Sequence, residues 1–275
     1  MCSTQNSIFP SSIFKSVWRY RQLIGTMAYR EIIGRYRGSI IGLAWSFFNP
    51  LLMLAIYTFV FSIVFKAKWN SDLGGGQGEF AVILFTGMII FNIFSECICR
   101  APTLIVSNAN YVKKIVFPLE VLPWVILGNA MFHGAISIFV LCVAQLLVFH
   151  AIPWTFLLLP VIMVPFLFGI IGACWILAAV GAYLRDLSQI IGVLITVLMF
   201  TSPLFFPLSA LPEHLQPFLM LNPLSYFIEE TRAIVIFGKL PSCYGLVIAY
   251  VASFIIAYIG YAFFQKVRKG FADVI

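Results

Sequence analysis

The chain has 275 residues, of which 62% are hydrophobic and only 10% are charged, and its mean hydropathy is +1.02. A typical soluble domain is about a quarter charged, so this composition excludes a water-soluble fold and indicates helices that face lipid. The formal net charge of +7 is explained by basic residues in loops on one side of a membrane, so we expect no nucleic-acid partner.

Residues 1–38 are predicted to be a cytoplasmic tail that contains an amphipathic helix. Apolar and basic residues alternate from residue 12 to residue 38, which is typical of a helix lying on a membrane surface. A tail that is merely charged is the alternative. Membrane lipid is therefore an expected partner of the chain.

Residues 39–275 are predicted to form an all-α, polytopic membrane domain with six transmembrane helices. About 20 apolar residues, at 1.5 Å per residue, cross a hydrocarbon core of about 30 Å. Residues 121–184 contain no Asp, Glu, Lys or Arg and are too long for one span, so we expect a turn at residues 150–153. The predicted spans are about 39–65, 80–99, 121–149, 154–184, 187–206 and 243–265. On the fourth span, Gly169, Gly172 and Ala173 indicate close helix packing.

The loop charges predict the orientation of the spans. Six spans place both termini on one side, and with that side inside, 13 Lys and Arg residues lie in inside segments and four lie outside. Cytoplasmic loops retain positive charge. We therefore expect a multi-pass protein of the cell inner membrane with both termini in the cytoplasm.

Two segments between the spans are predicted to be short helices. In the inside loop of residues 100–120, a helix of about three turns fits between Pro102 and Pro118, and its mixed polar and apolar face suits docking to another protein. Residues 207–240, outside, contain apolar stretches broken by prolines, which predict two re-entrant or interfacial helices, the second starting after Asn222-Pro223 and ending at Gly238. This outer region is a candidate gate.

The chain carries little catalytic chemistry of its own. It has no Gly-x-x-x-x-Gly-Lys-Ser/Thr string, so any ATP hydrolysis must come from a partner. The six cysteines lack metal-ligand spacing, and we expect no metal or other cofactor. Ionisable residues are almost absent from the spans, which leaves little for a proton or sodium relay.

A few polar residues do fall within the predicted spans. Glu96 is the one acid that could lie at membrane depth, and an ion pair with Arg100, one turn later, is the favoured interpretation. Asn129 and His133 share a face of the third span, with Gln145 further along it. Interhelical hydrogen bonding is the favoured interpretation of these three residues, and contact with a polar substrate is the alternative.

The first span has an aromatic stripe at helical spacing that could line a substrate path. Sugar rings present C–H faces that stack on aromatic rings, so a polymer could slide along such a lining. The stripe covers about a third of the helix circumference. Its members are Phe47, Leu54, Tyr57, Thr58 and Phe61, and the competing face carries Trp45, Phe48, Leu52 and Phe59.

Several strings, spread over nearly the whole chain, together resemble the ABC-2 type permeases that export O-antigen and related polysaccharides. They are Arg35-Tyr36-Arg37-Gly38-Ser39 with Gly42, Trp45 and Asn49-Pro50-Leu51-Leu52; Lys113-Lys114-Ile115-Val116-Phe117-Pro118-Leu119-Glu120-Val121-Leu122-Pro123; Arg185-Asp186; Thr201-Ser202-Pro203; and Asn222-Pro223.

The resemblance implies a homodimer of this chain bound to two copies of a separate ABC ATP-binding subunit, which holds the ATP and Mg. The implied substrate is an undecaprenyl-diphosphate-linked polysaccharide, moved from cytoplasm to periplasm. The inside loop of residues 100–120 would form the coupling helix. Its contact residues would be Asn108, Asn110, Tyr111, Lys113 and Lys114. The outer segment would form gate helices, with Pro217, Asn222, Pro223 and Tyr226 as the gate residues.

Other functions of the same architecture are left open by these motifs. Exporters of teichoic acid, capsule or drugs share it, although a drug exporter more often carries a large outer domain or a fused nucleotide-binding domain that 275 residues cannot hold. A membrane-embedded enzyme acting on polyprenyl lipids would need acids or histidines clustered near one membrane face, and here the acids are dispersed among the loops. We therefore expect a transporter permease rather than an enzyme.

Overall fold

The computed structural model describes residues 10–66, 69, 78–114, 117–208, 212, 214, 216–220 and 222–274. In these residues every regular element is a helix, which confirms the all-α prediction. The elements are α1 (Pro10–Arg35), η1 (Gly42–Ala44), α2 (Trp45–Tyr57), the π-helical η2 (Thr58–Val64), α3 (Glu79–Arg100), η4 (Ala101–Thr103), α4 (Leu104–Ser107), α5 (Ala109–Lys114), η5 (Leu119–Val121), α6 (Leu122–Phe149), η6 (Trp154–Leu158), α7 (Leu159–Gly181), α8 (Leu187–Thr201), α9 (Gln216–Met220), α10 (Pro223–Val235), α11 (Cys243–Val267), η8 (Arg268–Gly270) and α12 (Phe271–Val274).

Five helical stretches of the described chain are long and apolar enough to cross a membrane. They are Gly42–Val64, Glu79–Ser107, Leu119–Phe149, Trp154–Gly181 and Cys243–Gly270, which match the first four and the last of the predicted spans. The predicted span 187–206 contains α8, whose 15 residues reach only about 23 Å. The sixth span therefore stays a prediction.

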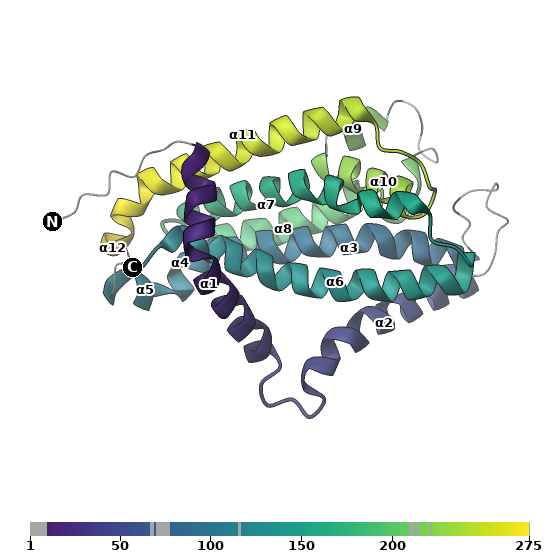
Figure 1. Cartoon of the computed structure of the whole chain (residues 1–275), viewed down its shortest axis with the longest axis horizontal. Coiled ribbons are helices and arrows are strands. Elements are labelled where there is room, and N and C mark those ends of the chain that lie inside the picture. Colours follow the sequence, from purple (N-terminus) through teal and green to yellow (C-terminus); the bar gives the residue numbers. More distant parts are fainter. Residues whose placement is uncertain are drawn as a thin grey trace.

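The long helices form a bundle in which α11 lies against α7 and α3 lies against α6 (Figure 1). Small residues allow the closest of these contacts. A Cβ added at Gly260 would lie 2.2 Å from the carbonyl oxygen of Gly172, and one added at Gly172 would lie 2.6 Å from the backbone nitrogen of Ala257. Close helix packing at Gly172 is thereby confirmed, since only glycine permits backbones to approach so closely.

The N-terminal segment is a long helix, as predicted, and it crosses the bundle instead of running along it. Figure 1 shows α1 lying across the other helices, and the chain changes direction sharply between α1 and α2. Its contacts are mainly with α6. The position of α1 at a membrane surface stays a prediction.

The first span is the most exposed helix of the bundle. Within α2, Ser46 alone is buried, and large apolar side chains such as Leu52, Ile56 and Phe59 are exposed. A helix that is apolar all round requires lipid or another protein to cover it.

The loop after α3 is helical, as predicted, but it is broken into α4 and α5 at Asn108. The side-chain Nδ2 of Asn108 donates to the carbonyl oxygen of Leu104 at 2.9 Å, and its backbone nitrogen bonds to Ile105 at 3.2 Å. An asparagine side chain that occupies a carbonyl in this way competes with the regular helix. Our prediction of one continuous helix of about three turns is therefore wrong, because two shorter helices take its place.

The outer segment contains two short helices, α9 and α10. The N-terminus of α10 agrees with the sequence prediction, because Pro223 follows the cap residue Asn222, whose side chain accepts a hydrogen bond from Leu224. The helix ends at Val235, three residues before Gly238. It packs between α3 and α7, so one face of it is buried in the bundle.

Candidate functional site

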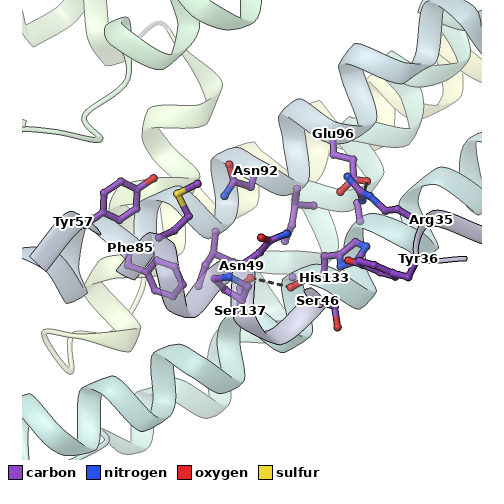
Figure 2. Close-up of a pocket in the computed structure, with 16 residues that line it drawn as sticks. Arg35, Tyr36, Ser46, Asn49, Tyr57, Phe85, Asn92, Glu96, His133 and Ser137 are labelled. Atoms are coloured by element: carbon purple, nitrogen blue, oxygen red, sulfur yellow. Dashed lines mark hydrogen bonds and ion pairs between the residues drawn. The ribbon is translucent and has the colours of Figure 1, made fainter. Parts of the chain in front are cut away.

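A polar cavity of about 180 Å³ lies between α2, α3 and α6. Figure 2 shows how the end of α1 closes one side of it. A second cleft, of about 810 Å³, lies between α1, α3 and α6 and shares Arg35, Asn92 and Glu96 with the first. The polar residues around the cavity are Arg35, Tyr36, Ser46, Asn49, Tyr57, Asn92, Glu96, His133 and Ser137.

Glu96 is the centre of this polar region. Its Oε1 accepts a hydrogen bond from Arg35 Nη1 at 2.8 Å and another from Asn129 Nδ2 at 3.0 Å. Arg100 Nη1 lies 3.7 Å from the same oxygen, so the predicted pair with Arg100 is present. The closer partner of Arg100 is Glu31 of α1. Two ion pairs thus connect the last turns of α1 with the last turn of α3.

Three buried polar atoms of α6 have no hydrogen-bond partner among the described residues: Nε2 of His133, Oδ1 of Asn129 and Oε1 of Gln145. His133 lines the cavity and Asn129 lines the cleft. A buried polar atom without a partner costs free energy. Each atom is therefore suited to bind water or a polar ligand.

Interhelical hydrogen bonding, the favoured interpretation of the polar residues of α6, is confirmed for two of the three. Asn129 bonds to Glu96 of α3, and Gln145 Nε2 donates to the carbonyl oxygen of Val235 in α10 at 2.6 Å. His133 contacts Tyr36 edge to face, with ring centroids 6.0 Å apart. Burial raises the pKa of the Tyr36 phenol, and the Arg35 charge opposes this shift, so at neutral pH the hydroxyl stays protonated and can donate.

The aromatic stripe of the first span is only partly gathered at the cavity. Tyr57 lines it. Phe61 instead stacks on Phe80 of α3, at 5.3 Å between ring centroids, and Phe47 lies 6.4 Å from Phe139 of α6. The hydroxyl of Thr58 bonds within its own helix, to Leu54. A role of these residues in a substrate path stays a prediction.

The predicted coupling residues lie at Asn108, between α4 and α5, and on α5 itself, at the end of the bundle where α12 also lies (Figure 1). Asn110 is exposed, and Tyr111 stacks on Phe117 at 4.6 Å between ring centroids. The side chains of Lys113 and Lys114 are outside the described residues. The docking role of this segment stays a prediction.

Among the predicted gate residues, Asn222 is the one with a defined hydrogen-bonding role. It is buried and donates to Ser202 Oγ at 2.8 Å, which joins the start of α10 to the end of α8. Tyr226 is half-buried, whereas Pro217 and Pro223 are exposed. Their part in a gate stays a prediction.

Arg232 is an important residue of this region that the sequence analysis did not single out. Its side chain is fully buried and donates from Nε to Ile83 at 3.2 Å, from Nη2 to Leu204 at 2.9 Å, and from Nη1 to Pro203 and to Glu229, the last at 2.9 Å. The guanidinium also lies 4.4 Å from the centroid of the Trp69 ring. The available signal was the string Glu229-Glu230-Thr231-Arg232 between the apolar residues of α10.

These features define a multi-pass membrane protein with a polar cleft at one end and a hydrogen-bonded anchor at the other. The family model described as ABC-2 type transporter matches residues 22–236, and the chain belongs to this family.

The relatives of the chain are transport permeases, and they align over almost its whole length. It is 26% identical to the O-antigen export system permease protein RfbA of Myxococcus xanthus, over 96% of this chain and 99% of the relative. It is 26% identical to the RfbA protein of Klebsiella pneumoniae, over 92% and 95%. It is also 26% identical to the polysialic acid transport protein KpsM of Escherichia coli, over 86% and 90%.

Proposed function

We propose that this chain is the membrane subunit of an ATP-driven exporter that moves lipid-linked polysaccharide of the O-antigen type from the cytoplasm to the periplasm. The alignment over nearly the full length of two O-antigen export permeases supports the substrate class. The observation in the structure that carries the proposal is the polar cavity with its adjoining cleft, because polar and charged side chains that line a cavity within a membrane domain commonly mark a substrate path.

A lipid-linked polysaccharide has a charged diphosphate and a sugar at the membrane surface and an isoprenoid chain in the lipid. The cleft below α1 is lined by two guanidinium groups, Arg35 and Arg100, together with the amides of Asn92 and Asn129. Both guanidinium groups are paired with carboxylates of the same cleft, Glu96 and Glu31, but each guanidinium carries five N–H donors. These groups are chemically suited to phosphate and hydroxyl oxygens. Sugar rings that pass further in would meet Tyr57 and Phe85 at the wall of the cavity.

Six spans with both termini in the cytoplasm complete this proposal. The helix α8 packs against η4, which follows the end of α3, while Leu204, just beyond α8, is joined through Arg232 to Ile83, near the start of α3. The segment therefore extends along nearly all of α3, or about 27 Å for the 18 residues between Ile83 and Ala101. This extent supports a sixth crossing in an inner membrane.

ATP and Mg would be held by a separate ABC ATP-binding subunit that docks on α4 and α5. Two such subunits would serve a homodimer of this chain. The exposure of α2 on nearly all sides supports a second copy as its cover. The ion pairs of Arg35 and Arg100 provide a physical connection, because they join the last turn of α3, directly before the docking segment, to α1.

The proposal is tested by removing the gene from its own cell and following the polysaccharide. We expect lipid-linked polymer to accumulate in the cytoplasm and the cell surface to lose it, with recovery by the wild-type chain. Arg35→Gln with Glu96→Gln should recover poorly, and Lys239→Gln, an exposed residue at the other end, should recover fully. Unchanged surface polymer, or a gain of drug sensitivity alone, would contradict the proposal.

A second substrate class is favoured by two of the relatives. The polysialic acid transporter KpsM is as identical to this chain as the O-antigen permeases are, although over a smaller share of it. The capsule polysaccharide export inner-membrane protein CtrC of Neisseria meningitidis is also similar, at 27% identity over 82% of this chain, so capsular polysaccharide is the alternative cargo. Sugar analysis of the polymer that accumulates in the deletion cell distinguishes the two classes.

A further inference from the structure

A second, apolar groove of about 660 Å³ lies between the N-terminal turns of α1 and the helices α6 and α7. Aromatic rings form much of its wall. The rings of Phe14 and Phe168 are 5.7 Å apart, and those of Trp124 and Phe168 are 6.3 Å apart. Trp18 also lines the groove and is 72% exposed, so the described chain leaves most of this ring uncovered.

Two cations, Lys15 and Arg19, stand at the groove. They are one helical turn apart on α1 and so lie on the same face. Neither forms an ion pair with another described residue. Residues 10–25 contain Lys15, Arg19 and Arg21 and no acidic residue, and the Arg21 guanidinium lies 4.8 Å from the centroid of the Trp18 ring. The polar rim of an apolar groove is therefore uniformly positive.

We propose that this groove binds an anionic phospholipid of the bilayer, with one acyl chain along the aromatic wall and the phosphate at Lys15 and Arg19. The chemistry of the groove matches both ends of such a molecule, because hydrocarbon is buried against Phe14, Trp124 and Phe168 while the anionic head finds unpaired cations. A zwitterionic phospholipid would make the same acyl-chain contacts, but its head group would be attracted only weakly to the two cations.

A membrane phospholipid fits this groove better than the isoprenoid chain of the exported substrate. The groove has no lining residue in common with the polar cavity or cleft. Arg19 is 12 residues before Glu31, where the polar cleft begins on α1, and 12 residues of helix extend about 18 Å. A phosphate held at Lys15 and Arg19 would therefore be far from the groups of the cleft.

A lipid in this groove would also fix the position of α1. The C-terminal turns of α1 are tied to α3 by Glu31 and Arg35, whereas its N-terminal turns meet α6 and α7 through the groove. The occupant of the groove would thus set how firmly the free end of α1 is held against the bundle.

The test is native mass spectrometry of the full chain in detergent, with palmitoyl-oleoyl phosphatidylglycerol, phosphatidylcholine of the same chains, or undecaprenyl phosphate added. We expect the wild type to retain phosphatidylglycerol in preference to phosphatidylcholine. Each basic residue near an anionic lipid contributes a factor of about five in affinity, so Lys15→Gln with Arg19→Gln should weaken phosphatidylglycerol binding by up to about 25-fold. Val17→Trp, which fills the groove without changing the charge, should weaken it as well.

The matched control is Lys266→Gln with Lys269→Gln, two exposed cations outside the groove whose loss changes the net charge equally. This variant should retain phosphatidylglycerol like the wild type. Equal weakening in both double variants, or equal retention of both phospholipids by the wild type, would overturn the proposal. Displacement of phosphatidylglycerol by an equal concentration of undecaprenyl phosphate would overturn it in favour of a substrate site.

Discussion

Replacing Arg232 by methionine tests how the outer end of the bundle is held together. Methionine keeps much of the length and apolar bulk of the side chain and removes its charge and all its hydrogen-bond donors. In a fully buried position, the change leaves the carbonyl oxygens of Ile83, Pro203 and Leu204 without the partner that they have in the wild type. It also removes the ion pair with Glu229.

The cost can be worked out from these contacts. Breaking a buried ion pair by removing one partner costs about 3–5 kcal/mol, and each hydrogen bond from a charged donor contributes about 1.5–3 kcal/mol. Glu229 is 35% exposed, so water can replace its lost partner and the lower end of the range applies. We expect a loss of about 3 kcal/mol, and hence a fall in the melting temperature of roughly 6–12 °C for a chain of this size.

The assay is thermal unfolding of the purified chain in detergent, with Lys239→Met as the control. Lys239 is exposed at the same end of the molecule, so its replacement likewise exchanges a cation for methionine but disturbs no buried network. Equal melting temperatures for the two variants would refute the reasoning, because they would show that Arg232 does not anchor α10 to α3 and to the end of α8.

Gly87 of α3 allows a second test of the hydrogen bonds made by Arg232. A Cβ at Gly87 would lie 2.7 Å from Arg232 Nη2, and the guanidinium cannot easily move while it donates to three carbonyl oxygens and a carboxylate. Gly87→Ala should therefore lower the melting temperature, whereas Gly192→Ala, with no atom within 4 Å of the new Cβ, should leave it unchanged or raise it slightly, since alanine favours helix over glycine. A harmless Gly87→Ala would show that the arginine is not held in place.

The remaining predictions concern transport. Reversing the charges of Lys113 and Lys114 to Glu should lower polymer export and stimulated ATP turnover while insertion stays normal, and normal export would remove the loop from the mechanism. Tyr57→Ala, at the cavity wall, should slow or shorten the exported polymer, whereas Phe59→Ala, an exposed position, should not; the reverse result would assign the path to the other face. Cross-linking residues 207–240 between two copies should block export, and free export from a fully cross-linked dimer would exclude a gating role.

The sequence predicted those features that depend on local composition. Five spans follow from charge-free lengths, because the bilayer core demands a fixed number of apolar residues. The start of α10 follows from Asn222 and Pro223, whose side chains favour a helix N-terminus by themselves. The pairing of Glu96 with Arg100 follows likewise from a spacing of four residues.

Other features depend on contacts between distant residues, and the sequence did not reveal them. Arg35 is 61 residues from Glu96, and nothing in either local pattern indicates that α1 crosses α3 at that point. The role of Arg232 depends on carbonyl oxygens of residues far from it in the sequence, those of Ile83 and Leu204. Any residue has a carbonyl oxygen, so a partner of this kind leaves no signature in the sequence.

The two ends of the bundle differ in how strongly they are held, and this difference bears on where movement occurs. The Arg35–Glu96 and Arg100–Glu31 pairs are partly exposed, with side-chain exposures of 51% and 18% for the first and 40% and 28% for the second. Exposed ion pairs of this kind contribute about 0–1 kcal/mol each. The contacts of Arg232 are buried and several times stronger.

A displacement of α4 and α5 by a docked partner would therefore meet little resistance from the ion pairs between α1 and α3. The same force would meet much more resistance from α10, which is held further by Gln145 at Val235 and by Thr155 at Ile234. Of these two ends, the polar cleft between α1 and α3 is consequently the one that can open at lower cost. If the outer segment also moves, the motion should be confined to the residues that precede α10, because α10 itself is fixed to α3 and to the end of α8.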